Sequence, residues 1–226
     1  YDLEGRRLES ATNVRVLGDG LFGTGNGLVA SREEERLELL RDGLLRLRTD
    51  EGTQVELRAL GEGSIALRRA GGREGAERAE VRLADGGELV ALGEQEVRVR
   101  GDSIALDGRV VETGEDIEAE GGGSRPRRAF LPEYAKVTGG VSFTRDEETL
   151  TGGWAELFFD GAGSVQRVRV YEDPVARGRV ALGEGPEVEP VEVTLSGLGP
   201  MELVYSAESP LAELGLPGPA TLEGIG

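Results

Sequence analysis

LTGGWAELFFDGAGSVQRVRVYED, residues 150–173, is the segment that decides the fold of this chain. An apolar and aromatic run at 154–159 is followed by a glycine-rich stretch at 160–164, and valines then return at 165, 168 and 170. Asp-Gly between two such runs is a strong hairpin signal. The segment therefore predicts strand, turn and strand, and the same pattern recurs along the chain with hardly any convincing helix between.

Other stretches alternate apolar and polar residues with a period of two, and arginine and glutamate fill many of the polar positions. Such alternation is typical of antiparallel strands that have one buried and one solvated face. These runs lie at 55–59, 64–68, 79–83, 96–100, 103–106, 191–195 and 201–205. Prolines at 200, 210, 217 and 219 predict a loop-like end to the chain.

Residues 32–48 allow two interpretations. Four leucines would share one face of a helix, namely Leu37, Leu40, Leu44 and Leu47. Alternatively, two short strands at 37–40 and 44–47 would form a hairpin about a turn at 41–43. A glycine at position 43 would cost a helix about 1 kcal/mol, so the hairpin is the preferred interpretation.

The composition indicates an extended architecture with much solvated surface. Hydrophobic residues make up 38% of the 226 positions, charged residues make up 31%, and there are 37 glycines. The glycine-rich and basic stretch at 121–128 predicts a linker between two stacked β modules, at 1–120 and 129–226. A formal net charge of −17 argues against a nucleic-acid partner, because phosphate binding needs a basic surface.

Nothing in the sequence predicts catalysis, a metal site or a cofactor. The chain has no cysteine and no histidine, and no serine lies in a nucleophile elbow. Gly18, Gly20 and Gly23 match a dinucleotide-binding spacing, but no helix follows to hold the phosphates. Acidic residues in Asp-Gly steps are dispersed, which favours hairpin turns over calcium loops; the steps begin at Asp19, Asp42, Asp85, Asp107 and Asp160.

The aromatic residues are predicted to pack in the core, with the lining of an apolar groove as the alternative. They include Phe130, Phe143, Trp154, Phe158 and Phe159. Alternation in the 150–173 segment predicts one apolar wall, whose members are Val141, Phe143, Ala155, Leu157, Phe159, Val168 and Val170. Glu156, Arg167 and Arg169 are expected to point away from it. These seven wall residues are the candidate lining of an apolar groove.

Two groups of segments resemble the periplasmic lipopolysaccharide-transport family, the OstA-like proteins LptA and LptC. The first is ATNVRV at 11–16, GNGL at 25–28 and LELLRDGLLRL at 37–47. The second is VTGGV at 137–141, LTGGWAEL at 150–157, GSV at 163–165 and DPVARGRV at 173–180. Together they cover about half of the chain, and none of them is a catalytic motif.

The resemblance implies an elongated, antiparallel, twisted β-jellyroll, or β-taco, that is folded into a V. Its apolar interior would shelter the acyl chains of lipopolysaccharide or a similar lipid. Its edge strands would pair with other β-jellyroll transport proteins in the periplasm, where a segment absent from this chain would anchor it to the inner membrane. The rival hypothesis is a structural β module of an envelope assembly that carries no lipid; an open trough favours the first and a closed core the second.

Overall fold

The structure is a computed structural model that describes residues 7–18, 20–49, 54–70, 77–92, 96–118, 124–180, 191–206, 209–216 and 218–225. Within these ranges there is no helix, and every strand pair is antiparallel, so the predicted all-β antiparallel chain is confirmed. The strands are β1 (Arg7–Gly18), β2 (Leu21–Ser31), β3 (Arg36–Arg48), β4 (Gln54–Ala59), β5 (Ser64–Ala70), β6 (Glu77–Ala84), β7 (Gly87–Leu92), β8 (Glu96–Gly101), β9 (Ser103–Glu118), β10 (Ser124–Arg145), β11 (Glu148–Phe159), β12 (Val165–Tyr171), β13 (Val175–Val180), β14 (Val191–Gly197), β15 (Met201–Ser206), β16 (Ser209–Gly215) and β17 (Ala220–Ile225).

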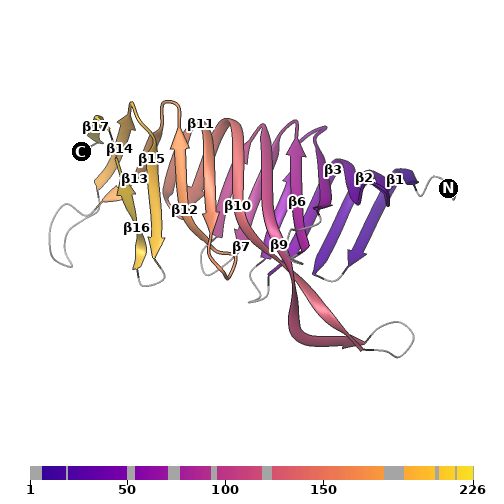
Figure 1. Cartoon of the computed structure of the whole chain (residues 1–226). Coiled ribbons are helices and arrows are strands. Elements are labelled where there is room, and N and C mark those ends of the chain that lie inside the picture. The colour runs from indigo at the N-terminus through magenta and orange to yellow at the C-terminus, as the bar shows by residue number, and fades with distance from the viewer. Residues whose placement is uncertain are drawn as a thin grey trace.

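The strands stand side by side along an elongated body, with the N-terminus at one end and the C-terminus at the other (Figure 1). Three long strands change their neighbour part-way along. The first half of β3 pairs with β5 and its second half with β4. In the same way β10 pairs with β9 and then β8, and β11 pairs with β13 and then β12. The chain is thereby divided into two layers that the long strands join.

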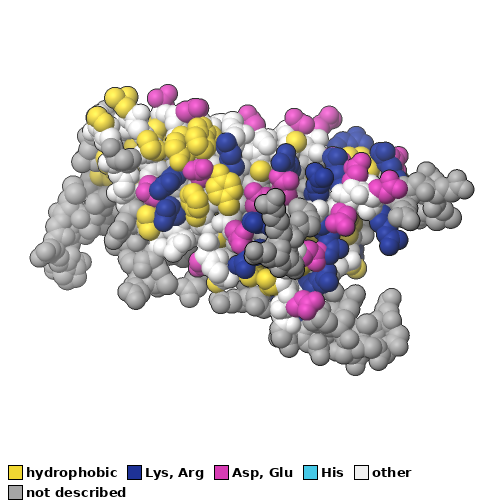
Figure 2. Space-filling model, in the orientation of Figure 1, with side chains coloured by type: hydrophobic (Ala, Val, Ile, Leu, Met, Phe, Trp, Pro, Cys, Tyr) yellow, Lys and Arg dark blue, Asp and Glu magenta, His cyan; other side chains and the backbone are white. Residues whose placement is uncertain are grey.

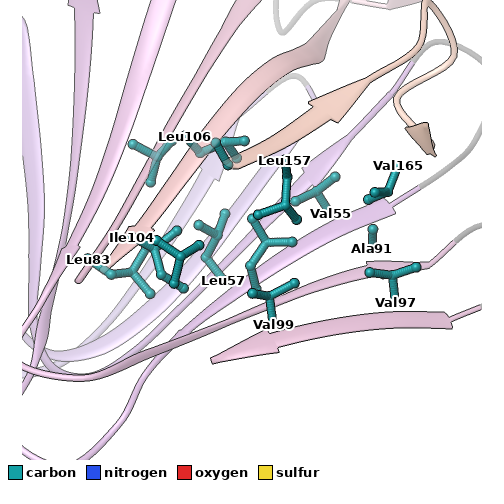
Figure 3. Close-up of a cluster of buried hydrophobic side chains, with 14 of the residues drawn as sticks. Val55, Leu57, Leu83, Ala91, Val97, Val99, Ile104, Leu106, Leu157 and Val165 are labelled. Carbon is teal, nitrogen blue, oxygen red and sulfur yellow. The ribbon is translucent and has the colours of Figure 1, made fainter. Parts of the chain in front are cut away.

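The first layer contains β5, β6, β9, β12, β15 and β16, and the second contains β4, β7, β8, β13, β14 and β17. Hydrogen bonding closes a ring of eight strands in the order β3, β5, β6, β9, β10, β8, β7 and β4. Side chains of the two layers meet between them, as Figure 3 shows for Leu106 and Leu157 against Leu57 and Val99.

The chain crosses between the layers along one line, called the fold line below. The short segments where the chain passes from one layer to the other are called rungs, and they are 41–43, 60–63, 85–86, 101–102, 139–140, 152–153 and 172–173. Backbone hydrogen bonds connect neighbouring rungs, for example from Gly86 N to Asp102 O at 2.7 Å and from Asp102 N to Thr138 O at 2.8 Å. Gly139 and Gly140 take φ values of +80° and +64°, a region that favours glycine. The fold line is therefore a continuous ladder of sharp bends.

These bends correct the interpretation of residues 32–48, which form neither a helix nor a hairpin. Strand β3 runs through the whole leucine-rich stretch and bends at Asp42, whose φ is +49°. Opposite this bend the β2–β3 register shifts, between Thr24 and Asn26. The reason is that β3 has different partners on either side of the bend, so Asp42 is a rung of the fold line instead of the tip of a hairpin.

Of the four Asp-Gly steps whose aspartate the structure describes, only the step at Asp160 is a hairpin turn. Asp160 Oδ1 accepts hydrogen bonds from the backbone N–H groups of Ala162 and Ser164, both at 2.9 Å. The step at Asp85 joins β6 to β7 in the other layer, and Asp107 lies inside β9, which pairs with strands on both sides. Asp19 lies outside the described residues.

Two further predictions concern the chain ends and the linker. The C-terminal region is less loop-like than its prolines predict, because β16 and β17 lie there. Residues 124–128 of the predicted linker belong to β10 and pair with β9 in an arm that projects from the body, while 121–123 lie outside the described residues (Figure 1). The division into two modules stays a prediction.

Candidate functional site

The candidate site is the apolar interior between the two layers. All seven predicted wall residues lie there, and none is more than 9% exposed. In β11 and β12, Ala155 faces Val170 and Leu157 faces Val168 across the strand pair. Val141 and Phe143 lie beyond the fold line, in the part of β10 that pairs with the second layer. The predicted wall is thus two facing walls, and alternation identified its residues but not their layers.

The interior is one continuous apolar cluster along the length of the body. It extends from Leu28 in β2 to Tyr205 in β15, and both layers contribute to it along the way. At the N-terminal end Val14 and Val16 of β1 are only partly covered, and at the C-terminal end the same is true of Leu214 in β16. The interior is therefore less completely covered at its two ends than along the middle of the body.

Most of the interior comes from residues that the sequence pattern did not single out by number. These residues, all almost fully buried, include Leu39, Leu45, Leu57, Ile65, Leu83, Leu89, Val99, Ile104 and Leu106. The same period-two alternation that identified the wall residues in β11 marks most of them. Strand β7 was missed because its residues 88–91 are all buried and show no alternation.

The edge of the layers opposite the fold line is called the mouth, and close packing shuts it at the middle of the body. Thr49, at the end of β3, is only 1% exposed. The β11–β12 turn packs directly on it: a Cβ atom added to Gly163 would lie 2.7 Å from Thr49 Cγ2 and 3.2 Å from Pro132 Cδ. Since β3 ends in the second layer and this turn belongs to the first, the contact joins the two layers.

Nearer the C-terminus, an arginine and a tyrosine close the mouth. The Arg145 guanidinium lies 3.9 Å from the centre of the Tyr205 ring, and Phe143 stacks on the same ring at 6.2 Å. The Tyr205 hydroxyl is buried without a hydrogen-bond partner, and its burial raises the pKa of the phenol. Burial also raises the pKa of the neighbouring Glu148 carboxyl. This part of the mouth therefore combines packed rings with polar groups that are partly or wholly removed from water.

Two of the aromatic residues predicted for the core lie on the outer surface instead. Trp154 and Phe158 alternate with Glu156 on the outer face of β11, while Phe143, Phe159 and Phe130 are buried. Trp154 stacks on Tyr171 at 3.8 Å. Figure 2 shows hydrophobic side chains gathered over this part of the first layer. Cross-strand pairing of these rings stabilises the sheet on its outer face, so the aromatic side chains contribute to stability without being buried in the core.

Elsewhere on the outer surface, two glutamates are buried beneath arginines. Glu56 and Glu88 are each only 2% exposed. Arg46 Nε donates to Glu56 Oε2 at 2.6 Å, and Arg58 binds the other oxygen of the same carboxylate. Burial raises the pKa of Glu56, but hydrogen bonds and positive charge from these arginines outweigh it, so the pKa of Glu56 is lowered overall. The network is structural, because it pins β3, β4 and β7 together.

Neither the described geometry nor comparison with known proteins identifies a chemistry. Within the described ranges no group of three or more acidic residues converges in a way that could hold a metal ion. Across the same ranges, no helix has the length and apolar character needed to cross a membrane. No protein-family model, curated protein or solved structure matches the chain.

Proposed function

We propose that this chain is a component of an envelope lipid-transport bridge, and that its interior shelters the acyl chains of a lipopolysaccharide-type lipid. The observation that carries the proposal is the continuous apolar cluster between two layers, from β2 to β15. Two antiparallel layers that meet along one fold line support the proposal of a V-shaped β-taco, the architecture that the resemblance implies. Burial of an acyl chain in such an interior would stabilise the complex by about 0.8 kcal/mol for each methylene group that is removed from water.

Unpaired strand edges at both ends support the bridging part of the proposal. Among the described strands, β1 pairs only with β2, β16 only with β15, and β17 only with β14. An exposed edge offers free backbone donors and acceptors to another sheet. The partners we propose are other β-jellyroll transport proteins in the periplasm, each extending the interior of its neighbour.

Photo-crosslinking in the native envelope tests the lipid proposal. A photoreactive residue at Leu157 or Phe143, whose side chains face the interior, is expected to capture lipid. The matched controls are Glu156 and Arg167, which alternate with interior residues on the outer face of β11 and β12. Equal capture from both faces, or none from the interior, would contradict the proposal.

The closed mouth favours a second candidate, a structural envelope module that carries no lipid. Its interior would be an ordinary protein core, held shut by Thr49, Gly163 and Pro132. Because the chain has no cysteine, a disulfide between Thr49→Cys and Gly163→Cys would lock the mouth without competing thiols, with some backbone strain at Gly163, whose φ is +87°. Locking is expected to reduce lipid capture at Leu157 if acyl chains enter through the mouth. A structural module would instead tolerate the lock, and protein purified from the envelope would carry no lipid in native mass spectrometry.

A further inference from the structure

A polar cavity of about 530 Å³ lies on the outer side of the second layer, between β8 and the end of β10. It is lined by Glu96, Arg98, Arg100, Ser142, Thr144 and Asp146. The strand register explains the hollow. Ser142 pairs with Arg100 and Thr144 pairs with Arg98, so two short hydroxyl side chains lie beside two long guanidinium side chains. The short residues form the floor, and the arginines form one wall.

The arginines of this wall are held in place from beneath. Arg100 Nε lies 2.8 Å from Glu88 Oε1, and the Glu88 side chain is only 3% exposed. Arg98 also reaches Glu88, at 3.6 Å, and binds Glu96 at 2.5 Å. A buried carboxylate that fixes two guanidinium groups leaves their outward N–H groups as preset donors. Such preorganisation lowers the entropy that a ligand would lose on binding.

The lining presents donors and acceptors in balance, and this selects the class of ligand. The arginines donate, the carboxylates of Glu96 and Asp146 accept, and the hydroxyls of Ser142 and Thr144 do both. The two carboxylates would repel a simple anion, and the two arginines would repel a simple cation. A neutral polyol has hydroxyl groups that both donate and accept hydrogen bonds, and neither set of charges repels it. We propose that this cavity binds a neutral sugar unit.

The position of the cavity connects it to the mouth. Asp146 belongs to the β10–β11 turn and directly follows Arg145, which closes the mouth against Tyr205. A headgroup joined to acyl chains in the interior would leave at Arg145 and reach the cavity by passing over this turn. The assignment of the sugar as a lipid headgroup rests on the proposed function, whereas the sugar site itself rests on the cavity alone.

Titration of the full chain with a neutral oligosaccharide that carries no phosphate, carboxylate or acyl group tests the sugar site, with ¹⁵N-resolved NMR as the readout. Amide signals of residues 98–100 and 142–146 are expected to shift, with a Kd of about 1 mM, typical of a weak and open polar site. Thr144→Phe fills the cavity and should weaken binding at least about tenfold, or by 1.4 kcal/mol. Thr144→Val removes only the hydroxyl and should weaken it less.

Thr194→Phe is the matched control, because Thr194 lies in the same cross-strand row, beyond Thr149 and Arg177, and does not line the cavity. It should leave the Kd unchanged. Absence of shifts at the cavity would overturn the proposal, as would equal losses in Thr144→Phe and Thr194→Phe. Tighter binding of a phosphorylated form of this oligosaccharide would overturn the choice of a neutral sugar.

Lipid capture at Leu157 separates this inference from the proposed function. If oligosaccharide binds the cavity while interior capture fails, the sugar site stands and the lipid-transport function does not. If interior capture at Leu157 succeeds while oligosaccharide leaves the cavity signals of the wild-type chain unmoved, the lipid function stands and the sugar site is refuted.

Discussion

Replacing Glu56 by glutamine tests how the buried carboxylates hold the second layer together. The side chain of Glu56 is only 3% exposed and binds two guanidinium groups, one of them at 2.6 Å from Arg46 Nε. A hydrogen bond to a charged group contributes about 1.5–3 kcal/mol. The arginines are 44% and 46% exposed, so solvent screens part of this interaction. Glu56→Gln, which keeps the shape and one oxygen acceptor, should therefore cost about 2 kcal/mol of unfolding free energy at pH 7.

The cost should also depend on pH in a defined direction. The pKa of Glu56 in the folded protein is lowered from 4.5, so the stabilisation is fully present above the unfolded pKa and is lost as the pH falls through the folded pKa. Glutamine does not titrate. The difference between wild type and Glu56→Gln should thus be constant above about pH 5 and shrink below about pH 4.5.

Urea unfolding at several pH values measures both effects, since urea leaves the ionic strength unchanged. Glu9→Gln is the control, because Glu9 also pairs with an arginine, Arg7, at 2.7 Å, but both side chains are about 60% exposed. It should change the unfolding free energy by less than about 0.5 kcal/mol. If Glu56→Gln costs no more than Glu9→Gln, or if its cost stays the same in acid, the reasoning about buried charge is wrong.

Three further outcomes are expected. Leu157→Ala should cost about 2–5 kcal/mol in urea unfolding, because this fully buried side chain would leave a cavity; a cost below 1 kcal/mol would mean that the interior is loosely packed. Gly140→Ala should lower the unfolding free energy by about 1–2 kcal/mol, because the φ of Gly140 is +64°. Gly139→Ala should lower it more, because its added Cβ would also lie 2.5 Å from the carboxyl carbon of Asp102. Equal costs for the two variants would contradict the fold-line geometry. Burial and a hydrogen bond to Glu156 raise the pKa of Tyr134 to about 12. A step in the absorbance at 295 nm is therefore expected near that pH, and Tyr134→Phe should lack this step. A step that is lost in Tyr134→Phe but has its midpoint near pH 10 would contradict the prediction.

Local pattern in the sequence was enough to predict most of the strands and their inner faces, although it missed β7. Leu157 is buried and Glu156 is on the outer face, as alternation predicts, because a strand has a side-chain period of two whatever its neighbours are. The same rule would have placed Trp154 and Phe158 outside with Glu156. The general preference of aromatic residues for cores led to the opposite prediction, and the period of the strand was the stronger constraint.

Partner choice and layer assignment came only from the tertiary structure. The bend at Asp42 follows from β3 having β5 on one half and β4 on the other, and both strands lie later in the chain. Val141 shares an apolar face with Ala155, yet the two belong to different layers because the fold line passes between them. A period of two fixes which side a residue faces, but it carries no information on where a strand changes neighbours.

The closed mouth and the polar cavity also depend on contacts between distant segments. Thr49 and Gly163 are more than a hundred residues apart in the chain, and Ser142 lies beside Arg100 only through strand pairing. The sequence by itself determined an all-β chain with a one-sided apolar face, because that property depends on neighbouring residues alone. Whether that face becomes an open trough or a shut interior was decided by long-range packing, since it depends on which turns of one layer reach the strand ends of the other.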